Sequence, residues 1–252
     1  MNMAGDAPDH KCHEAGSPEL TRGPDTTETL LRTLRRCKLF ASVSGRELRT
    51  ILSLGRERYF ANRATVFCQG GRAESIYVVI QGKVKLLLNG PSGRGIILTF
   101  VGPGETFGYL DPMARGTTRA YSALAVEESR VLEWPAKTVE EIIKHHPAVA
   151  RDALRLTAQQ LKTGCIRLHD LVSEPVARRL ARAILRLAPA SAHRTAPDLI
   201  MTQQDLADYL GTTPPTLSRI FGRWKTRGLV TSGRQRIVIK HPDDLARIAG
   251  PD

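Results

Sequence analysis

The spacing of hydrophobic residues changes along this chain, and each change predicts a different kind of element. Near the start, Leu30, Leu31 and Leu34 fall on one face of a short helix, and the segment VSGRELRTILSLG predicts a second. In that segment Ser44 and Glu47 have the spacing of a capping box, which marks a helix start. Residues 1–25 are rich in polar residues, Gly and Pro and predict a disordered tail.

From residue 56 to 135 the pattern becomes that of a sheet. Short β-branched runs such as SIYVVIQG, KVKLLL, GIILTFV and SRVLEW alternate with Gly or Pro turns about every ten residues. Strands at this spacing are typical of a small antiparallel sandwich or roll. We therefore expect this segment to form the core of the first domain.

Helical spacing returns from about 137 to 173. Two series of apolar residues there each repeat every seven residues, offset by four: Leu154, Leu161 and Leu168, and Ala158, Cys165 and Val172. A seam of this kind usually pairs with a second copy of itself, which predicts a parallel two-helix dimer interface. The alternative, that the stripe packs on its own roll, applies to the first turns near Ile142 and Ile143.

After Glu174 and Pro175 the chain shows the spacing of a helix-turn-helix. Thr202 is placed to cap a helix that ends at Gly211, and Thr213 to cap a second helix with Pro214 and Pro215 in its first turn. The segment LVTSGRQRIVIK then predicts a hairpin that would form a wing. Helix, glycine turn, helix and wing together favour a DNA-binding module.

These patterns predict an α+β fold: an antiparallel β-roll, a long dimerisation helix and a winged helix-turn-helix. The expected divisions are a tail at 1–25, a β-roll domain at 26–137, a dimerisation helix at 138–173 and a DNA-binding domain at 174–252.

Charge points to a polyanionic partner. The chain of 252 residues carries a formal net charge of +12. Between Gly211 and His241 there are seven Lys or Arg residues and no Asp or Glu, which is the pattern of a surface that neutralises phosphates. A solvated cationic helix in a purely structural module is the alternative, but the helix caps, turn and wing that accompany the charge favour double-stranded DNA.

Other classes of protein are disfavoured. No apolar run is long enough to span a bilayer and the first residues lack the apolar core of a signal peptide, so we expect a cytoplasmic protein with no membrane partner. The four cysteines form no C-x-x-C pair, and no histidine occurs between His13 and His145, so we expect no metal site. A roll without clustered histidines is not expected to be an enzyme of the cupin type.

The residues resemble the CRP/FNR transcription regulators over about 28–248. The resemblance rests on the order and spacing of GGRAESIYVVIQGKVKL, GPGETFGYL with Arg119-Ala120 ten residues on, EPVARRLARAIL and TQQDLADYLGTTPPTLSRIFGRW. It implies a homodimer on a two-fold symmetric operator, a signal at the roll that gates binding, and RNA polymerase as a further partner if the protein is an activator.

The resemblance also implies DNA contacts. Arg219 would contact a guanine edge, with Ser218 beside it, whereas Pro215 stands where many relatives place a glutamate that accepts from cytosine. The full set of candidate DNA-binding residues is Thr212, Thr213, Thr216, Ser218, Arg219, Arg223, Arg234 and Arg236.

The same resemblance places a candidate effector site at Gly108, Tyr109, Arg119, Ala120 and Cys165. Arg119 matches the arginine that binds the cyclic phosphate in cyclic-nucleotide members, but Tyr109 replaces the glutamate that holds their ribose. Gly164 and Cys165 likewise replace hydroxyl residues that contact adenine. We therefore do not expect cyclic AMP to be the effector, and no cofactor is identified.

Three alternatives for the sensor stay open: a different small molecule, a gas or redox signal, or no ligand at all. Haem sensing has a weak basis in Cys68, Cys165 and His169. A second function also stays open, that of a cyclic-nucleotide-binding regulatory module that acts on a protein partner. The basic winged region argues against it.

Overall fold

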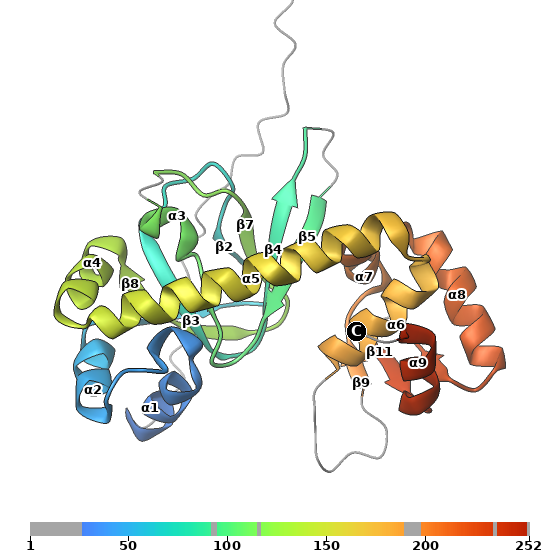
Figure 1. The fold of residues 1–252 in the computed structure, drawn as a ribbon, viewed down its shortest axis with the longest axis horizontal. Helices are drawn as coiled ribbons and strands as arrows, with labels where there is room; N and C mark the ends of the chain where they lie inside the picture. The colour runs from blue at the N-terminus through green and yellow to red at the C-terminus, as the bar shows by residue number, and fades with distance from the viewer. Residues whose placement is uncertain (1–26, 92–94, 115–116, 189–197, 234–235, 251–252) are drawn as a thin grey trace, which may run out of the picture. The chain divides into compact units, whose positions relative to one another are not determined.

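The computed structural model describes residues 27–91, 95–114, 117–188, 198–233 and 236–250, whose elements Figure 1 shows. The chain divides into two compact units. One comprises Met1–Leu88 and Phe100–Ala153, and the other Asn89–Thr99 and Leu154–Asp252. Strand β5 and helix α5 each begin in one unit and end in the other, so both are continuous connections between the two. The tail predicted at 1–25 lies outside the described residues.

Short helices open the first unit, in agreement with the apolar spacing. They are α1 (Thr27–Arg36), the 3₁₀ helix η1 (Lys38–Phe40) and α2 (Gly45–Ser53). The hydroxyl of Ser44 accepts from the Glu47 N–H at 3.3 Å, and the Glu47 carboxylate accepts from the Ser44 N–H at 2.9 Å. This reciprocal pair confirms the predicted capping box.

Two four-stranded sheets form the β-roll, as the turn spacing predicted. Their strand orders are β1-β8-β3-β6 and β2-β7-β4-β5, and the pairs β1·β8, β3·β8, β3·β6, β2·β7 and β4·β7 are antiparallel. The strands are β1 (Arg56–Phe60), β2 (Thr65–Phe67), β3 (Ser75–Gln81), β4 (Val84–Asn89), β5 (Gly95–Val101), β6 (Thr106–Phe107), β7 (Ser122–Ala125) and β8 (Ser129–Pro135). The turn helix α3 (Leu110–Met113) follows β6.

The core of the roll is centred on β3. All of its residues except the last are buried, because β3 lies inside its sheet and also contacts α1 and α4. This explains why SIYVVI is a continuous apolar run and does not alternate. Trp134 on β8 is buried beside it, and its indole N–H donates to the carbonyl of Ile51 at 2.8 Å, which joins α2 to the sheet.

The helical region predicted at 138–173 consists of two helices, α4 (Ala136–His145) and α5 (Pro147–Ser173). They separate at His146, whose backbone leaves the helical region because the next residue is a proline. The first turns of α5 are anchored by Asp152, which is 2% exposed and accepts from the N–H and the hydroxyl of Ser42, both at 2.7 Å.

The C-terminal part of the second unit is a winged helix-turn-helix. Its elements are α6 (Val176–Leu187), β9 (Asp198–Ile200), α7 (Gln203–Leu210), α8 (Pro214–Thr226), β10 (Val230–Ser232), β11 (Arg236–Ile239) and α9 (Pro242–Ala249). The three strands pair in the order β10-β11-β9, both pairs antiparallel. Helix α6 packs on α9 and α7 on α8, around buried Leu206, Leu217, Phe221 and Trp224.

None of the helices in the described ranges is both long and apolar enough to cross a membrane.

Candidate functional site

A capped helix and a tight turn position the second helix of the helix-turn-helix. The hydroxyl of Thr202 accepts from the Asp205 N–H at 3.0 Å, which confirms Thr202 as the cap of α7. The helix ends at Gly211, whose φ of 61° is a left-handed conformation that glycine adopts without strain. The chain then turns through two residues into α8.

The start of α8 differs from the prediction that the Thr213 side chain caps it. Thr213 occupies the N-cap position, but its side chain makes no cap hydrogen bond. Pro215 has no N–H to offer, and the Thr216 N–H already donates to the Thr213 carbonyl at 3.0 Å. The Thr213 hydroxyl lies instead 3.1 Å from the Thr216 hydroxyl, at the surface of the helix start.

Helix α8 has one buried face and one polar face. Leu217, Phe221 and Trp224 are buried against the rest of the domain, and Ile220 is half-buried. Ser218, Arg219 and Arg223 are exposed. At 3.6 residues per turn, all three lie on the side of the helix away from Leu217. Of the remaining candidates, Thr213 is exposed, and Thr212 and Thr216 are half-buried.

Five exposed cations of the second unit, on or next to α8 and at the end of the wing, have no partner among the described residues. Within the described residues, no hydrogen bond or ion pair is made by the side chains of Arg219, Arg223, Lys225, Arg227 and Lys240. Arg236 is exposed at the start of β11, and Arg234 lies outside the described residues. A surface of cations without counter-charges is ready to accept an anion, because no internal partner has to be displaced first.

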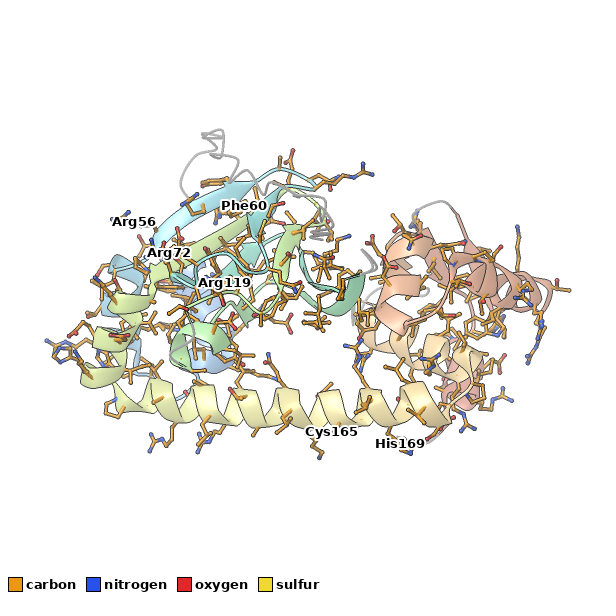
Figure 2. The ribbon with its side chains drawn as sticks, turned by 90° about the horizontal axis from the view of Figure 1, so that it is seen from above. Arg56, Phe60, Arg72, Arg119, Cys165 and His169 are labelled. Atoms are coloured by element: carbon orange, nitrogen blue, oxygen red, sulfur yellow. The ribbon has the colours of Figure 1, made fainter. Side chains whose placement is uncertain are left out.

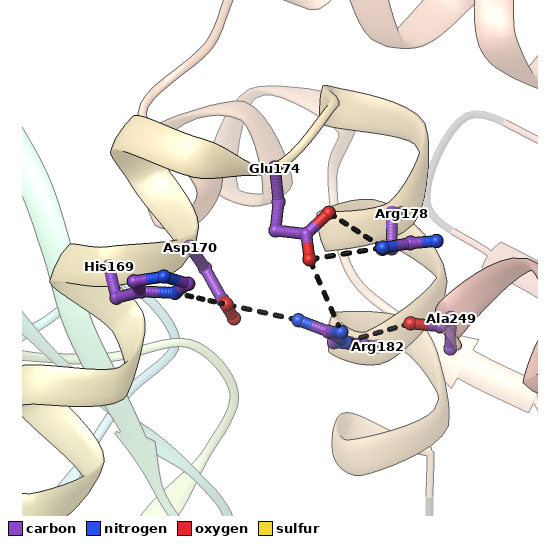
Figure 3. Close-up of polar contacts among 6 residues, drawn as sticks. All are labelled: His169, Asp170, Glu174, Arg178, Arg182 and Ala249. Atoms are coloured by element: carbon purple, nitrogen blue, oxygen red, sulfur yellow. Dashed lines mark hydrogen bonds and ion pairs between the residues drawn. The ribbon is translucent and has the colours of Figure 1, made fainter. Parts of the chain in front are cut away.

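Two arginines of α6, in contrast, are paired with carboxylates. Figure 3 shows Arg178 and Arg182 with the carboxylates at the end of α5. Arg178 Nη1 lies 3.0 Å from Glu174 Oε2, and Arg182 Nη1 lies 3.0 Å from Asp170 Oδ1. Arg182 Nε also donates to the carbonyl of Ala249 at 2.9 Å. These cations stabilise the domain internally, so its positive charge is divided into a structural group and a free group.

The bend that carries Arg119 lies in the first unit, and Figure 2 labels this residue. Arg119 is 2% exposed. Its Nη1 donates to the carbonyl of Gly108 at 2.7 Å and its Nη2 to the carbonyl of Ser75 at 2.6 Å. The guanidinium carbon lies 4.2 Å from the centre of the Phe67 ring. Two carbonyls and an aromatic face therefore already compensate the charge that was predicted to meet an effector.

Aromatic residues enclose the rest of this bend. Tyr109 is 1% exposed. The N–H of Gly108 donates to the hydroxyl of Tyr121 at 3.2 Å, and the rings of Tyr77 and Phe107 stack with their centres 5.1 Å apart. Burial raises the pKa of Tyr121 to about 12, so its phenol stays neutral.

The structure describes all five candidate effector residues. Gly108, Tyr109 and Arg119 are buried together, whereas Ala120 is exposed and Cys165 lies on α5 in the second unit. Sequence reasoning missed Phe67, Tyr77 and Tyr121, which surround Arg119. Their aromatic character was the only available signal, since strands distant in sequence bring them together.

The predicted dimer seam is exposed along α5. The side chains of Leu154, Leu161, Leu168 and Val172 are 70%, 68%, 65% and 82% exposed, and Ala158 and Cys165 are exposed between them. Such a large unpartnered apolar stripe on a helix marks an interaction surface.

Of the residues considered for haem, Cys68 belongs to the first unit and Cys165 and His169 to the second. Figure 2 labels Cys165 and His169 on α5, and both are exposed. The Nδ1 of His169 lies 3.7 Å from Asp170 Oδ1. Cys68 is disulfide-bonded, so its sulfur is not a free thiol. In the ranges that the structure describes, no group of three or more His, Cys, Asp or Glu could hold a metal ion.

Comparison with known proteins covers both units. A family model described as a cyclic nucleotide-binding domain matches residues 57–146, and one described as a Crp-like helix-turn-helix domain matches residues 178–248.

Curated relatives match over most of their length. The CRP-like cAMP-activated global transcriptional regulator of Mycobacterium tuberculosis is 30% identical over 196 residues, which are 75% of this chain and 86% of that protein. The cyclic AMP receptor protein of Thermus thermophilus is 28% identical over 211 residues, 84% and 96% of the two chains. The solved structure of FixK2 from Bradyrhizobium japonicum covers 79% of this chain and 98% of its own, at 25% identity and a TM-score of 0.70.

Proposed function

This chain belongs to the CRP/FNR family of transcription regulators, and from that premise we propose that it binds a two-fold symmetric DNA operator as a homodimer, under the control of a signal at the β-roll. Family membership makes it a DNA-binding regulator with a helix-turn-helix. The symmetric operator, the dimer and the control by the roll are our proposal. RNA polymerase is the further partner we propose if the protein activates transcription.

The proposal for DNA rests on the cations of α8 and on Lys240, which have no partner among the described residues. Arg219 and Arg223 are four residues apart, so they lie on one exposed face of α8 with Ser218. A guanidinium free of internal partners can present its planar donors to a guanine edge, and such a contact contributes about 1–3 kcal/mol of discrimination between bases. Lys240, at the end of the wing, is placed to bind phosphate without reading sequence.

The test compares these two kinds of contact. Duplexes bound by the wild type are selected from a random pool, and the affinity for the selected palindrome and for a scrambled duplex is measured over a range of salt. We expect Arg219→Ala to remove the preference for the palindrome, and Lys240→Ala to weaken both duplexes alike while the salt slope falls by about 1. If Arg219→Ala kept the wild-type preference, the assignment of α8 as the reading helix would be wrong.

The dimer proposal rests on the exposed seam of α5. Leu154, Leu161 and Leu168 recur every seven residues and are all more than half exposed, so a second copy of the helix would bury a surface that water now covers. Two recognition helices joined by one dimer axis would bind two half-sites related by the same symmetry.

For the sensor we propose a signal other than cyclic AMP, although the mycobacterial and Thermus relatives are named for cyclic AMP. A cyclic phosphate would need donors of Arg119 that now bind the carbonyls of Gly108 and Ser75. It would also meet a bend in which Tyr109, 1% exposed, replaces the glutamate of the cyclic-nucleotide members. An anion at Nη1 or Nη2 would compete with these two charge-assisted hydrogen bonds, which leaves the buried Nε as the donor of Arg119 with no partner among the described residues.

A further inference from the structure

We propose that Arg167 is a positioning residue for DNA binding, because it ties strand β5 to the last turn of α7, the first helix of the helix-turn-helix. The inference rests on the proposed function, since it concerns how the DNA-binding helices are held. The residues involved, at 97–98, 167 and 209, all belong to the second unit.

One guanidinium makes all of these contacts. Nη1 of Arg167 donates to the carbonyl of Leu98, and Nη2 donates to the carbonyl of Ile97 at 3.3 Å and to that of Tyr209 at 3.0 Å. The guanidinium carbon also lies 4.4 Å from the centre of the Tyr209 ring. The planar fork of arginine can span three carbonyls in this way, whereas a lysine ammonium is a single compact donor group.

The contact at α7 satisfies a carbonyl that the helix itself leaves open. The last carbonyls of a helix have no partner in the next turn, and they carry the negative end of the helix dipole. In α7 the Tyr209 carbonyl accepts from Arg167 and the Leu210 carbonyl accepts from Arg179 Nη1 at 2.8 Å. Arg186 holds the other end of the Tyr209 side chain by a hydrogen bond to its hydroxyl. Tyr209 is 5% exposed, so this arrangement is enclosed.

Strand β5 extends from this contact into the roll. Ile97 is fully buried, and the strand ends at Val101, which is 3% exposed and belongs to the first unit. A shift along β5 therefore moves the carbonyls that Arg167 binds. Because the same guanidinium holds Tyr209, such a shift changes the hydrogen bonds at the end of α7, next to the turn that orients α8.

A direct phosphate contact by Arg167 is the alternative, and the geometry disfavours it. Arg167 is half-buried, which lowers its pKa, and both Nη1 and Nη2 already donate to carbonyls. The two roles predict different salt dependence, because only a phosphate contact contributes to the release of counterions.

The experiment measures the affinity of the full-length protein for the selected palindrome at several salt concentrations, for Arg167→Gln and Arg167→Lys. We expect both variants to bind roughly 5- to 50-fold more weakly, with an unchanged salt slope and unchanged preference over the scrambled duplex. Arg151→Gln is the matched control, because Arg151 is an exposed residue of α5 that makes no hydrogen bond or ion pair within the described residues, and it should bind as the wild type does.

A second variant tests the link to β5. Leu98→Gly loosens the strand while it keeps the carbonyl that Arg167 binds. If Arg167 is the connection, Leu98→Gly weakens DNA binding in the wild type and has no further effect in the Arg167→Gln background. Additive losses in affinity would mean that the strand and the helix are not joined through this side chain.

The outcomes separate the two proposals. If the wild type showed no preference for any duplex, the proposed function would fail and Arg167 would have no role to explain. If the wild type bound the palindrome and Arg167→Lys bound it equally well, only the inference would be overturned. A salt slope reduced by about 1 in Arg167→Gln, and restored in Arg167→Lys, would instead identify a phosphate contact. Should Arg167→Gln fail to fold, Arg167→Lys decides, since it keeps the charge and most of the stem.

Discussion

The guanidinium carbon of Arg119 lies 4.2 Å from the centre of the Phe67 ring, and two of its nitrogens donate to main-chain carbonyls. An arginine held in this way is part of the core of the roll, although its position in the sequence suggests a ligand contact. The distinction can be measured as stability, because a core arginine is needed in the absence of any ligand.

Replacement of Arg119 should therefore destabilise the unliganded protein. Arg119→Met keeps most of the stem over Phe67 but leaves the carbonyls of Gly108 and Ser75 without a donor, which should lower the free energy of unfolding by about 2–4 kcal/mol. Urea denaturation followed by circular dichroism measures the loss. Arg72→Met is the control, because Arg72 is exposed and its side chain pairs with Glu74 alone among the described residues, so its cost should stay below about 1 kcal/mol. Equal losses of unfolding free energy in the two variants would mean that Arg119 does not stabilise the core.

Cyclic AMP should not bind with micromolar affinity. Nη1 and Nη2 of Arg119 already donate to main-chain carbonyls, and Tyr109 stands at the position where cyclic-nucleotide members of the family carry a glutamate. Isothermal titration calorimetry of the purified protein should show no saturable heat up to millimolar cyclic AMP. The same sample must bind the selected palindrome, which shows that it is folded and competent. A saturable isotherm at micromolar concentration would overturn this view of the bend.

Local features of the fold could be predicted from the sequence, because few residues decide them. The capping box at Ser44, the cap at Thr202 and the left-handed Gly211 each depend on neighbours within four positions, and all three are present. The Thr213 side chain was predicted wrongly as a cap. There the two prolines remove N–H groups that a threonine hydroxyl would otherwise accept from.

Contacts between distant segments could not be predicted. Composition showed that the C-terminal domain is rich in arginine, but it could not show that Arg182 is bound by Asp170 and Glu174 while Arg219 is unpaired. Similarly, a family motif identifies the position of Arg119, yet its acceptor at Ser75 is 44 residues away in the chain and is set by the sheet. Which arginines are paired inside the protein and which are exposed to a ligand is decided by the packing of the folded domain.

The capping box at the start of α2 should make stability depend on pH in the acid range. Hydrogen bonds from Ser44, with a smaller contribution from His146, lower the pKa of Glu47 to about 2. A carboxylate with a lowered pKa stabilises the fold at pH values above its ordinary pKa of 4.5, and this contribution is lost as the pH falls toward 2. The difference in unfolding free energy between the wild type and Glu47→Gln should therefore narrow from pH 5 to pH 2.5 in urea titrations. In a Ser44→Ala background the pH dependence should become smaller but remain, because the backbone N–H of residue 44 and His146 still bind the Glu47 carboxylate. A difference that stayed constant with pH in the wild-type background would contradict the assignment.

If α5 pairs with a second copy as we propose, a single charge in its seam should separate the dimer. Leu161 lies in the middle of the repeat and is 68% exposed, so Leu161→Glu would place two carboxylates opposite each other in a parallel pair of helices. We expect the variant to sediment as a monomer at concentrations where the wild type is a dimer, and to bind the palindrome at least tenfold more weakly, since each half-site then binds separately. Gln159→Glu introduces the same charge on the same helix outside the seam, and it should remain dimeric. Because Leu161 buries little surface within its own chain, its loss should leave the circular dichroism spectrum unchanged. A Leu161→Glu protein that remained dimeric would show that the exposed stripe of α5 has another partner.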